Sequence, residues 1–417
     1  MFPELIPICQ KLYRRRLADV PGAVSRELRG SGLPARIAPG ARIAVTVGSR
    51  GIANLPAILA AVIAEVRAAG GEPFLLAAMG SHGGATPEGQ LALLASLGVT
   101  ENALGVPVRS SMDVVQLSET AAGVPVYFSR LAGEADGIVL VARVKEHTDY
   151  THPVESGLLK MIAIGLGNHR GAETLHSLGA RGLPAAIPEV AGVVLATGRV
   201  LLGLALLENG YHETAEVVAI PPDRIEETER GLLRRVKRTA PRLPFRDMDV
   251  LIVEEMGKDI SGVGLDTKVL GRRRIPGEPE FRRPFIHTVV VLDLSEASHG
   301  NAIGVGLADL TTQRLVDKID RHTMYTNALT SGFLERNKIP VTLPTDREAI
   351  AAALTSGISK PPEQVRLVRL QNTGRLDRLW VSPPLLDEVR AHPKLEIVGP
   401  PRPLAFDRAG QLLMERE

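Results

Sequence analysis

The sequence has little cysteine, few aromatic residues and little excess charge of either sign. Cys9 is the only cysteine, which excludes an intramolecular disulfide and a zinc site built from four cysteines. Aromatic residues make up 3% of the chain, which argues against a stacking platform for single-stranded nucleic acid. The formal net charge is +2, and no basic arm is present. We therefore expect neither nucleic acid nor a membrane surface as a partner.

Long apolar runs are also missing. No stretch of about 18 uncharged apolar residues exists, so we expect no membrane-spanning segment. The N-terminus soon reaches charged residues and shows no secretory signal. The expected location is therefore the cytoplasm.

The chain is long enough for two domains. It has 417 residues, of which 44% are hydrophobic and 23% are charged, an ordinary globular composition. Residues 240–244 contain two prolines and resemble a linker. We predict an N-terminal domain over residues 1–240 and a C-terminal domain over residues 245–417.

The apolar pattern of the first domain predicts a parallel sheet. A buried strand over residues 42–47 is followed by a helix over 55–69 and a second strand over 73–79. This βαβ unit implies parallel strands with a right-handed crossover. A third buried strand covers residues 137–144, and an amphipathic helix over 223–239 ends the domain.

The second domain also alternates strands and helices. One strand begins at residue 249 and another covers residues 288–294. The predicted fold class is therefore α/β with two domains: a Rossmann-like parallel sheet first, then a smaller α/β domain. We expect the active site in the cleft between them.

Three loops after predicted strands carry polar side chains. Ligands of open α/β sheets bind beyond the carboxyl ends of parallel strands. Arg50 lies in the first loop, His82 in the second, and Lys145 and His147 in the third. Two histidines at the ends of adjacent strands can exchange protons on both sides of a prochiral centre near neutral pH. The alternative is a pair of exposed loop histidines without a function.

The loop around His82 is rich in glycine. Gly80, Ser81, Gly83 and Gly84 would let the backbone approach a ligand, and free N–H groups there would hold an anion. The spacing matches neither the dinucleotide fingerprint nor the Walker pattern. A tight turn is the alternative interpretation.

The densest group of candidate residues covers residues 155–169. Lys160 lies in an apolar run, where a lysine either extends to water or is partly desolvated and suited to an imine, thioamide or phosphate contact. Asn168 and His169 follow a glycine-rich turn, a pattern typical of a metal-ligand or phosphate loop. His152 and His176 lie nearby as further metal ligands, although no HExxH-type spacing is present.

Taken in order, four motifs resemble those of the lactate racemase family. They are Gly80-Ser81-His82, Lys145-Glu146-His147, Ser156-Gly157 with Lys160, and Asn168-His169. The resemblance covers most of residues 40–215 and extends more faintly to residues 258–266.

The resemblance implies two α/β domains and a nickel-pincer nucleotide, in which a pyridinium mononucleotide carries two sulfur groups around nickel. His82 and His147 match the acid/base pair, and Lys160 matches the lysine that tethers the cofactor. His169 is the candidate nickel ligand. Arg50 and Lys258 match the arginine and lysine that hold the substrate carboxylate. The remaining predicted cofactor contacts are Gly80, Ser81, Gly83, Gly84, Ser156, Gly157 and Asn168.

The chain departs from the family pattern in three places. Leu158 and Leu159 stand where lactate-specific members have two glycines, and Gly83 replaces an arginine. Lys160 also lies further from His147 and closer to His169 than in the family. These departures bear on the substrate more than on the cofactor.

The predicted activity is therefore that of an isomerase, a racemase or epimerase of an α-hydroxy acid. The resemblance implies hydride transfer to and from the cofactor, and it implies cofactor-biosynthesis proteins as partners in the cell. One alternative is a small-anion or nucleotide-binding sensor, for which Arg50, the glycine loop and Lys160 would suffice. A nicotinamide-dependent dehydrogenase fits less well, because residues 48–51 do not form the glycine fingerprint.

Overall fold

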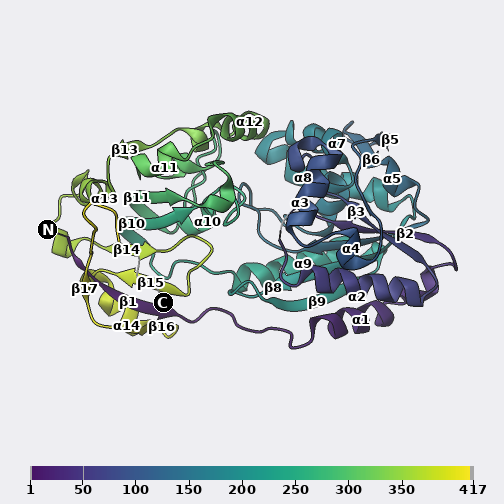
Figure 1. Ribbon diagram of the computed structural model, residues 1–417, viewed down its shortest axis with the longest axis horizontal. Coiled ribbons are helices and arrows are strands. Elements are labelled where there is room, and N and C mark those ends of the chain that lie inside the picture. Colours follow the sequence, from purple (N-terminus) through teal and green to yellow (C-terminus); the bar gives the residue numbers. More distant parts are fainter. Residues whose placement is uncertain (1, 50, 414–417) are drawn as a thin grey trace. The chain divides into compact units, whose positions relative to one another are not determined.

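A computed structural model describes residues 2–49 and 51–413 (Figure 1). Residues Tyr13–Ala240 form one compact unit, here called the first unit. The described residues on either side of that segment form the second unit. The predicted α/β class is confirmed, since both units contain a sheet with parallel strands and helices between them.

The first unit contains a six-stranded sheet in the order β4-β3-β2-β7-β8-β9. All neighbouring strands are parallel except β9, which is antiparallel to β8. Its strands are β2 (Arg42–Val47), β3 (Glu72–Ala77), β4 (Val108–Arg109), β7 (Gly137–Arg143), β8 (Val200–Glu208) and β9 (Thr214–Ile220). A separate hairpin contains β5 (Val114–Glu119) and β6 (Pro125–Ser129).

The sheet of the first unit is buried on both faces, as expected of parallel strands. Along β2, Ile43 and Val45 belong to one apolar cluster, whereas Ala44 belongs to another. Helices α1 (Val20–Gly30), α2 (Leu55–Ala68) and α3 (Pro87–Ser96) contribute to the first cluster. The opposite cluster contains side chains of α6 (Leu158–Lys160), α7 (Asn168–His176), α8 (Gly179–Leu195) and α9 (Ile225–Thr239). Two short helices, α4 (Glu101–Leu104) and α5 (Arg130–Gly133), complete the unit.

Local chemistry explains where these helices begin and end. The Thr86 hydroxyl accepts a hydrogen bond of 3.1 Å from the Gly89 N–H and so caps the start of α3. Gly70, with φ +85°, follows the end of α2 in the left-handed conformation that glycine adopts without strain. In α9, acidic residues in the first turn and basic residues in the last turn complement the helix dipole.

The second unit contains a larger, mixed sheet with the main strand order β13-β12-β11-β10-β14-β15-β1-β16. Strands β13 to β14 in this order are parallel, and β15, β1 and β16 are added antiparallel. The strands are β1 (Glu4–Gln10), β10 (Asp247–Met256), β11 (Phe285–Leu294), β12 (Leu310–Thr312), β13 (Val341–Leu343), β14 (Leu367–Leu370), β15 (Arg378–Val381), β16 (Leu395–Ile397) and β17 (Arg402–Pro403). Its helices are α10 (Thr267–Leu270), α11 (Gln313–Asp317), α12 (Arg321–Ser331), α13 (Asp346–Thr355) and α14 (Leu386–Ala391).

The start of the chain corrects the predicted domain range of 1–240. Strand β1 pairs with β15 and β16, so residues up to Leu12 pack in the second unit. Ile6 and Ile8 point into the core of that unit, and their burial explains the pairing. No strand was predicted at this position from the sequence.

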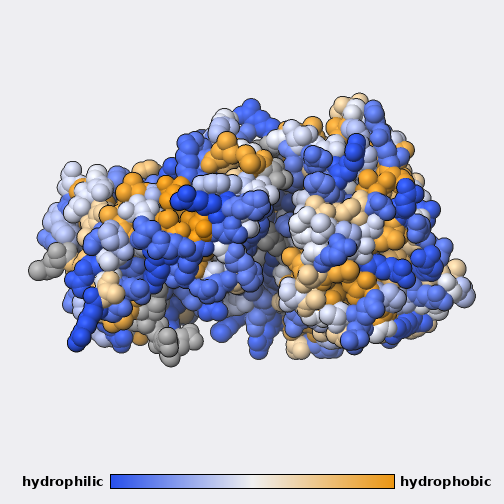
Figure 2. All heavy atoms as spheres, turned by 45° about the horizontal axis from the view of Figure 1, so that its top comes forward, coloured by the Kyte–Doolittle hydropathy of each residue, from blue (hydrophilic) through white to orange (hydrophobic). Residues whose placement is uncertain are grey.

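The face of the molecule shown in Figure 2 is mostly hydrophilic, with apolar side chains in separate patches. Among the residues that the structure describes, no helix has the length and apolar character needed to cross a membrane.

Candidate active site

The carboxyl end of β2 is the topological switch point of the first unit's sheet. The chain adds β3 and β4 on one side of β2, then β7 and β8 on the other. Ligands of open α/β sheets bind at such a point. The loop of Arg50 follows β2, that of His82 follows β3, and that of His147 follows β7. The strands that precede the two histidines were predicted to be adjacent. In the structure they instead flank β2.

The His82 loop packs closely on the segment that follows Lys160. Gly80 has φ +61°, and a Cβ there would lie 3.0 Å from the Ile164 Cγ2 atom, so this close approach favours glycine. The buried Gln90 side chain donates from Nε2 to the carbonyl oxygens of Gly80 at 3.1 Å and His82 at 3.4 Å. The loop backbone is thus fixed, while the His82 side chain is exposed.

The other predicted residues of this loop lie between His82 and α3. Gly83 and Gly84 lie in a single 3-10 turn, Gly83–Ala85, and Ser81 is half-buried. A Cβ at Gly84 would meet no atom within 4 Å, so this side of the loop is open.

His147 lies in a closed loop over residues 145–156. Backbone hydrogen bonds of 3.0 and 3.2 Å between Lys145 and Ser156 close its base. The Tyr150 ring stacks on the imidazole with 4.1 Å between centroids and an interplanar angle of 13°. The Asp149 N–H donates to His147 Nδ1 at 3.1 Å, so the proton of the neutral ring resides on Nε2.

The electrostatic surroundings keep His147 neutral. Its side chain is 11% exposed, and burial, together with the positive charge of Lys160, lowers the pKa of His147 well below its ordinary value. The Asp149 carboxylate opposes this shift. Burial by the surrounding chain and the charge of Lys160 also lower the pKa of His176, although that side chain keeps access to solvent. Lys160 and the two histidines therefore lie within electrostatic range of one another.

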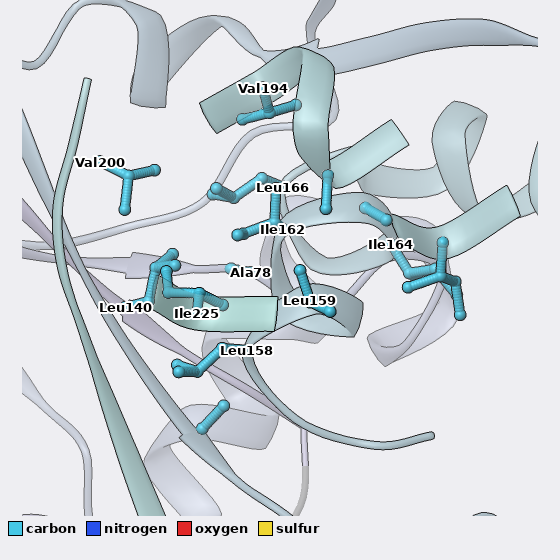
Figure 3. Packing of buried hydrophobic residues seen from close by; sticks show 14 of the residues in the cluster. Ala78, Leu140, Leu158, Leu159, Ile162, Ile164, Leu166, Val194, Val200 and Ile225 are labelled. Atoms are coloured by element: carbon cyan, nitrogen blue, oxygen red, sulfur yellow. The ribbon is translucent and has the colours of Figure 1, made fainter. Parts of the chain in front are cut away.

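Lys160 ends the short helix α6 and is followed by a π-helical turn, Met161–Gly165. Single π turns often occur at functional sites. Leu158, Leu159 and Ile162 lie in the apolar cluster with Leu140 (Figure 3). Lys160 itself is half-buried, so its neighbours anchor the backbone in the core while the amine remains within reach of a ligand.

Helix α7 carries two histidines on one face. His169 and His176 are seven residues apart, which is about two turns at roughly 3.6 residues per turn. His169 was the nickel ligand predicted from the sequence, and both histidines are exposed. The structure instead brings His176 into the field of Lys160 and Asp149. Because the two histidines lie two turns apart on the same face of α7, the sequence makes either one a candidate nickel ligand. Only the packing of α7 distinguishes them.

Asn168, Ser156 and Gly157 have contacts within the protein. Asn168 is buried at φ +50°, and its Nδ2 donates to the Ser111 carbonyl oxygen at 2.8 Å. Ser156 pairs with Lys145 through its backbone. Gly157 lies against the carboxyl group of Glu229. These three predicted cofactor contacts support the loops of the site.

Glu229 is a buried carboxyl group that the sequence analysis missed. Burial raises the pKa of Glu229 to about 7, although the N–H groups of Leu159 and Leu158 oppose the shift. In the sequence it is one of several glutamates on a charged helix, and nothing distinguishes it from its exposed neighbours.

The two predicted substrate-binding residues belong to different segments of the chain. Arg50 lies outside the described residues. Lys258 follows β10 in the second unit, where its Nζ donates to Asn327 Oδ1 and its N–H donates to Ser298 Oγ at 2.7 Å. Within residues 2–49 and 51–413, no group of three or more histidine, cysteine, aspartate or glutamate side chains is arranged to hold a metal ion.

Comparison with known families identifies the segment that carries this site. Residues 18–184 match the model of the lactate racemase N-terminal domain. This segment is therefore similar to the N-terminal domain of lactate racemases. The resemblance predicted from the sequence is thereby confirmed, and the matched segment includes the loops of His82 and His147, Lys160 and both histidines of α7.

Among curated proteins, none gives a significant match to the chain. Among solved structures, the chain is similar to the lactate racemase apoprotein from Thermoanaerobacterium thermosaccharolyticum, with 14% sequence identity and a TM-score of 0.44. The match covers 68% of this chain and 69% of that one.

Proposed function

We propose that this protein is an isomerase that racemises or epimerises a small α-hydroxy acid with a nickel-pincer nucleotide. The observation that carries the proposal is the grouping of neutral His147 with Lys160 and His176 at the switch-point edge of a lactate racemase domain. Perturbed histidines and a half-buried lysine at such an edge are typical of catalytic sites.

The chain offers groups that fit this cofactor. Lys160 presents an amine beside an imidazole, His176, which is the combination that a tether and a nickel ligand require. We propose His176 in place of His169 as the ligand, because His176 lies closer to the charges of the site. The open side of Gly84 and the neighbouring backbone would accept the phosphate. When bound, the nucleotide supplies the acceptor and donor of hydride at the α-carbon.

His147 would move the hydroxyl proton of the substrate. Its low pKa keeps the ring neutral at pH 7, as a general base must be. To accept a proton at Nε2, the ring must carry its own proton on Nδ1. The Asp149 carboxylate, with Oδ2 3.8 Å from Nδ1, is the acceptor available for that proton. Asp149 would thus select the tautomer of His147. In this structure its N–H favours the ring with the proton on Nε2, and during turnover its carboxylate would favour the ring with the proton on Nδ1.

His82 would act as the second acid/base group. It follows β3, on the opposite side of β2 from the strand that precedes His147. Two histidines that approach the switch point from opposite sides suit proton transfer to either face of a planar keto acid. The substrate carboxylate would be held by Arg50 and Lys258, since a monocarboxylate next to the reacting carbon requires a cation.

A single preparation tests the proposal. Protein produced together with the enzymes that synthesise the cofactor is analysed for nickel, for the mass of a Lys160 adduct, and for chiral conversion of a panel of α-hydroxy acids. We expect close to stoichiometric nickel and conversion of at least one acid in both directions. Lys160→Met should lose the adduct, whereas the exposed Arg238→Met should keep it.

Other outcomes would contradict the proposal. Loaded protein that binds an acid without converting any enantiomer would indicate a sensor. Oxidation that consumes a nicotinamide would indicate a dehydrogenase. Full racemase activity in nickel-free protein would exclude the nickel cofactor.

A further inference from the structure

Helix α9 contacts both segments that carry the proposed catalytic groups. Glu229 and Lys237 lie eight residues apart on this helix, about 12 Å along its axis at roughly 1.5 Å per residue. Glu229 contacts the backbone of α6, and Lys237 contacts the His147 loop. The helix lies outside both segments and touches each through one charged side chain.

The contact with the His147 loop runs through Glu155, whose side chain is fully buried. Glu155 Oε2 accepts from the His147 N–H at 2.6 Å, and Oε1 accepts from the His152 N–H at 3.2 Å. Lys237 Nζ lies 2.5 Å from Oε1 and also donates to the His152 carbonyl oxygen at 3.0 Å. A buried carboxylate that loses its cation is strongly destabilised. Lys237 therefore allows Glu155 to hold the backbone of His147.

The contact with the Lys160 segment runs through Glu229, which is 1% exposed. Its Oε2 accepts from the N–H groups of Leu158 and Leu159, the latter at 3.2 Å. These N–H groups begin α6 and have no partner within the helix. A Cβ at Gly157 would lie 2.5 Å from the same carboxyl oxygen, so the carboxyl group fills the space beside the chain. Glu229 thus fixes the turn from which Lys160 projects.

We propose that Lys237 and Glu229 are positioning residues, and that α9 sets the placement of His147 relative to Lys160. This inference rests on the proposed function, because it assigns both segments to one reaction. Neither residue touches the reacting atoms in this scheme. A displacement of about 1 Å in a catalytic group can reduce turnover about 100-fold, so the effect would appear in kcat more than in KM.

The decisive variant is Lys237→Met, which keeps the apolar stem and removes the cation. Arg238→Met is the matched control, because Arg238 is the next residue of α9 and is exposed. Lys237→Arg is the rescue variant, since it restores a cation of similar reach. Amide hydrogen exchange is measured over residues 145–157 of the cofactor-free protein, and steady-state kinetics are measured on the loaded enzyme.

We expect Lys237→Met to raise exchange of the His147 and His152 amides about tenfold or more, and to lower kcat about 10- to 100-fold with KM within about twofold. Arg238→Met should change neither, and Lys237→Arg should restore most of both. Unchanged exchange in Lys237→Met would overturn the inference, as would faster exchange with full turnover. If wild-type enzyme converts no hydroxy acid, the proposed function fails, whereas the exchange result still decides whether α9 positions the loop.

Discussion

The two sheets present different chemistry at the same kind of edge. In the first unit, the loops after β3 and β7 carry His82 and His147, and the latter is desolvated beside Lys160. In the second unit, the loops after β10 and β11 form a network in which hydroxyl groups donate hydrogen bonds to a carboxylate. There Asp259 Oδ1 accepts from the hydroxyls of Ser295 at 2.5 Å and Ser298 at 3.1 Å.

This difference shows that sheet topology alone does not determine where catalytic side chains lie. Both edges are carboxyl ends of parallel strands, which is where ligands bind in such sheets. Hydrogen bonds from hydroxyl groups to a carboxylate such as Asp259 stabilise a loop by about 1.5–3 kcal/mol each. Desolvated imidazole and ammonium groups in one field are costly, and such perturbed groups are concentrated at functional sites. The proton chemistry that we propose therefore belongs to the first unit, and Lys258 is the residue of the second unit that we propose to bind substrate.

The largest expected effect comes from removing the acid/base pair. His82→Ala and His147→Ala should each reduce kcat about 10²- to 10⁴-fold, the usual contribution of a general acid or base. The measurement is steady-state racemisation by loaded enzyme at fixed nickel content. His322→Ala, at an exposed histidine of the second unit, is the control and should retain normal turnover. Near-normal kcat in either site variant would make that histidine an ordinary loop residue and would remove the contrast between the two edges.

The next effect concerns the stability of the first unit as pH changes. Burial raises the pKa of Glu229 from 4.5 to about 7, so the folded state binds more protons than the unfolded state between these values. The contribution to stability is present below pH 4.5 and is lost as pH rises through about 7. At about 1.4 kcal/mol per pKa unit, the loss is about 3 kcal/mol.

The variant Glu229→Gln isolates this loss. Its amide oxygen can still accept from the backbone, but it cannot ionise. Between pH 5 and pH 8, the free energy of unfolding of the variant should therefore rise relative to wild type by up to about 3 kcal/mol. Chemical denaturation at both pH values measures it. Glu227→Gln, at an exposed position of α9, should change by less than about 0.5 kcal/mol. Equal pH dependence in Glu229→Gln and wild type would show that Glu229 titrates normally.

Much of the fold could be predicted because local patterns determine it. The apolar runs at residues 42–47 and 137–144 correspond to β2 and β7, and the charged amphipathic segment corresponds to α9. Strand β1 could not be predicted, because its partners β15 and β16 lie more than 350 residues later in the sequence. The strand order could not be predicted either, since tertiary packing and no local pattern places β7 beside β2.

The site was predictable in part for the same reason. Ordered motifs predicted His82, His147 and Lys160 as site residues, because each follows a strand or a glycine turn, and their roles stay predictions. The choice between His169 and His176 depends on how α7 packs, which no local pattern contains. The supporting contacts of Glu229 and Lys237 depend on α9, and these contacts join residues that are 70 and 85 positions apart in the sequence.

The smallest expected effect concerns Lys258 in the second unit. A variant of Lys258 tests whether this edge of the second sheet binds substrate without taking part in the chemistry. Asn327 orients the Lys258 amine, and a hydrogen bond between such a cation and a carboxylate contributes about 1.5–3 kcal/mol. Lys258→Met should therefore raise KM for the hydroxy acid about tenfold and leave kcat within about threefold, and Asn327→Ala should reproduce part of this change.

Lys318→Met is the control, because Lys318 instead pairs with Asp293 at 3.0 Å and Glu296 at 2.9 Å. An unchanged KM in Lys258→Met would place the carboxylate elsewhere. A fall in kcat as large as that of His147→Ala would mean that the second unit takes part in the chemistry, because a residue that only binds substrate cannot lower turnover at saturation to that extent.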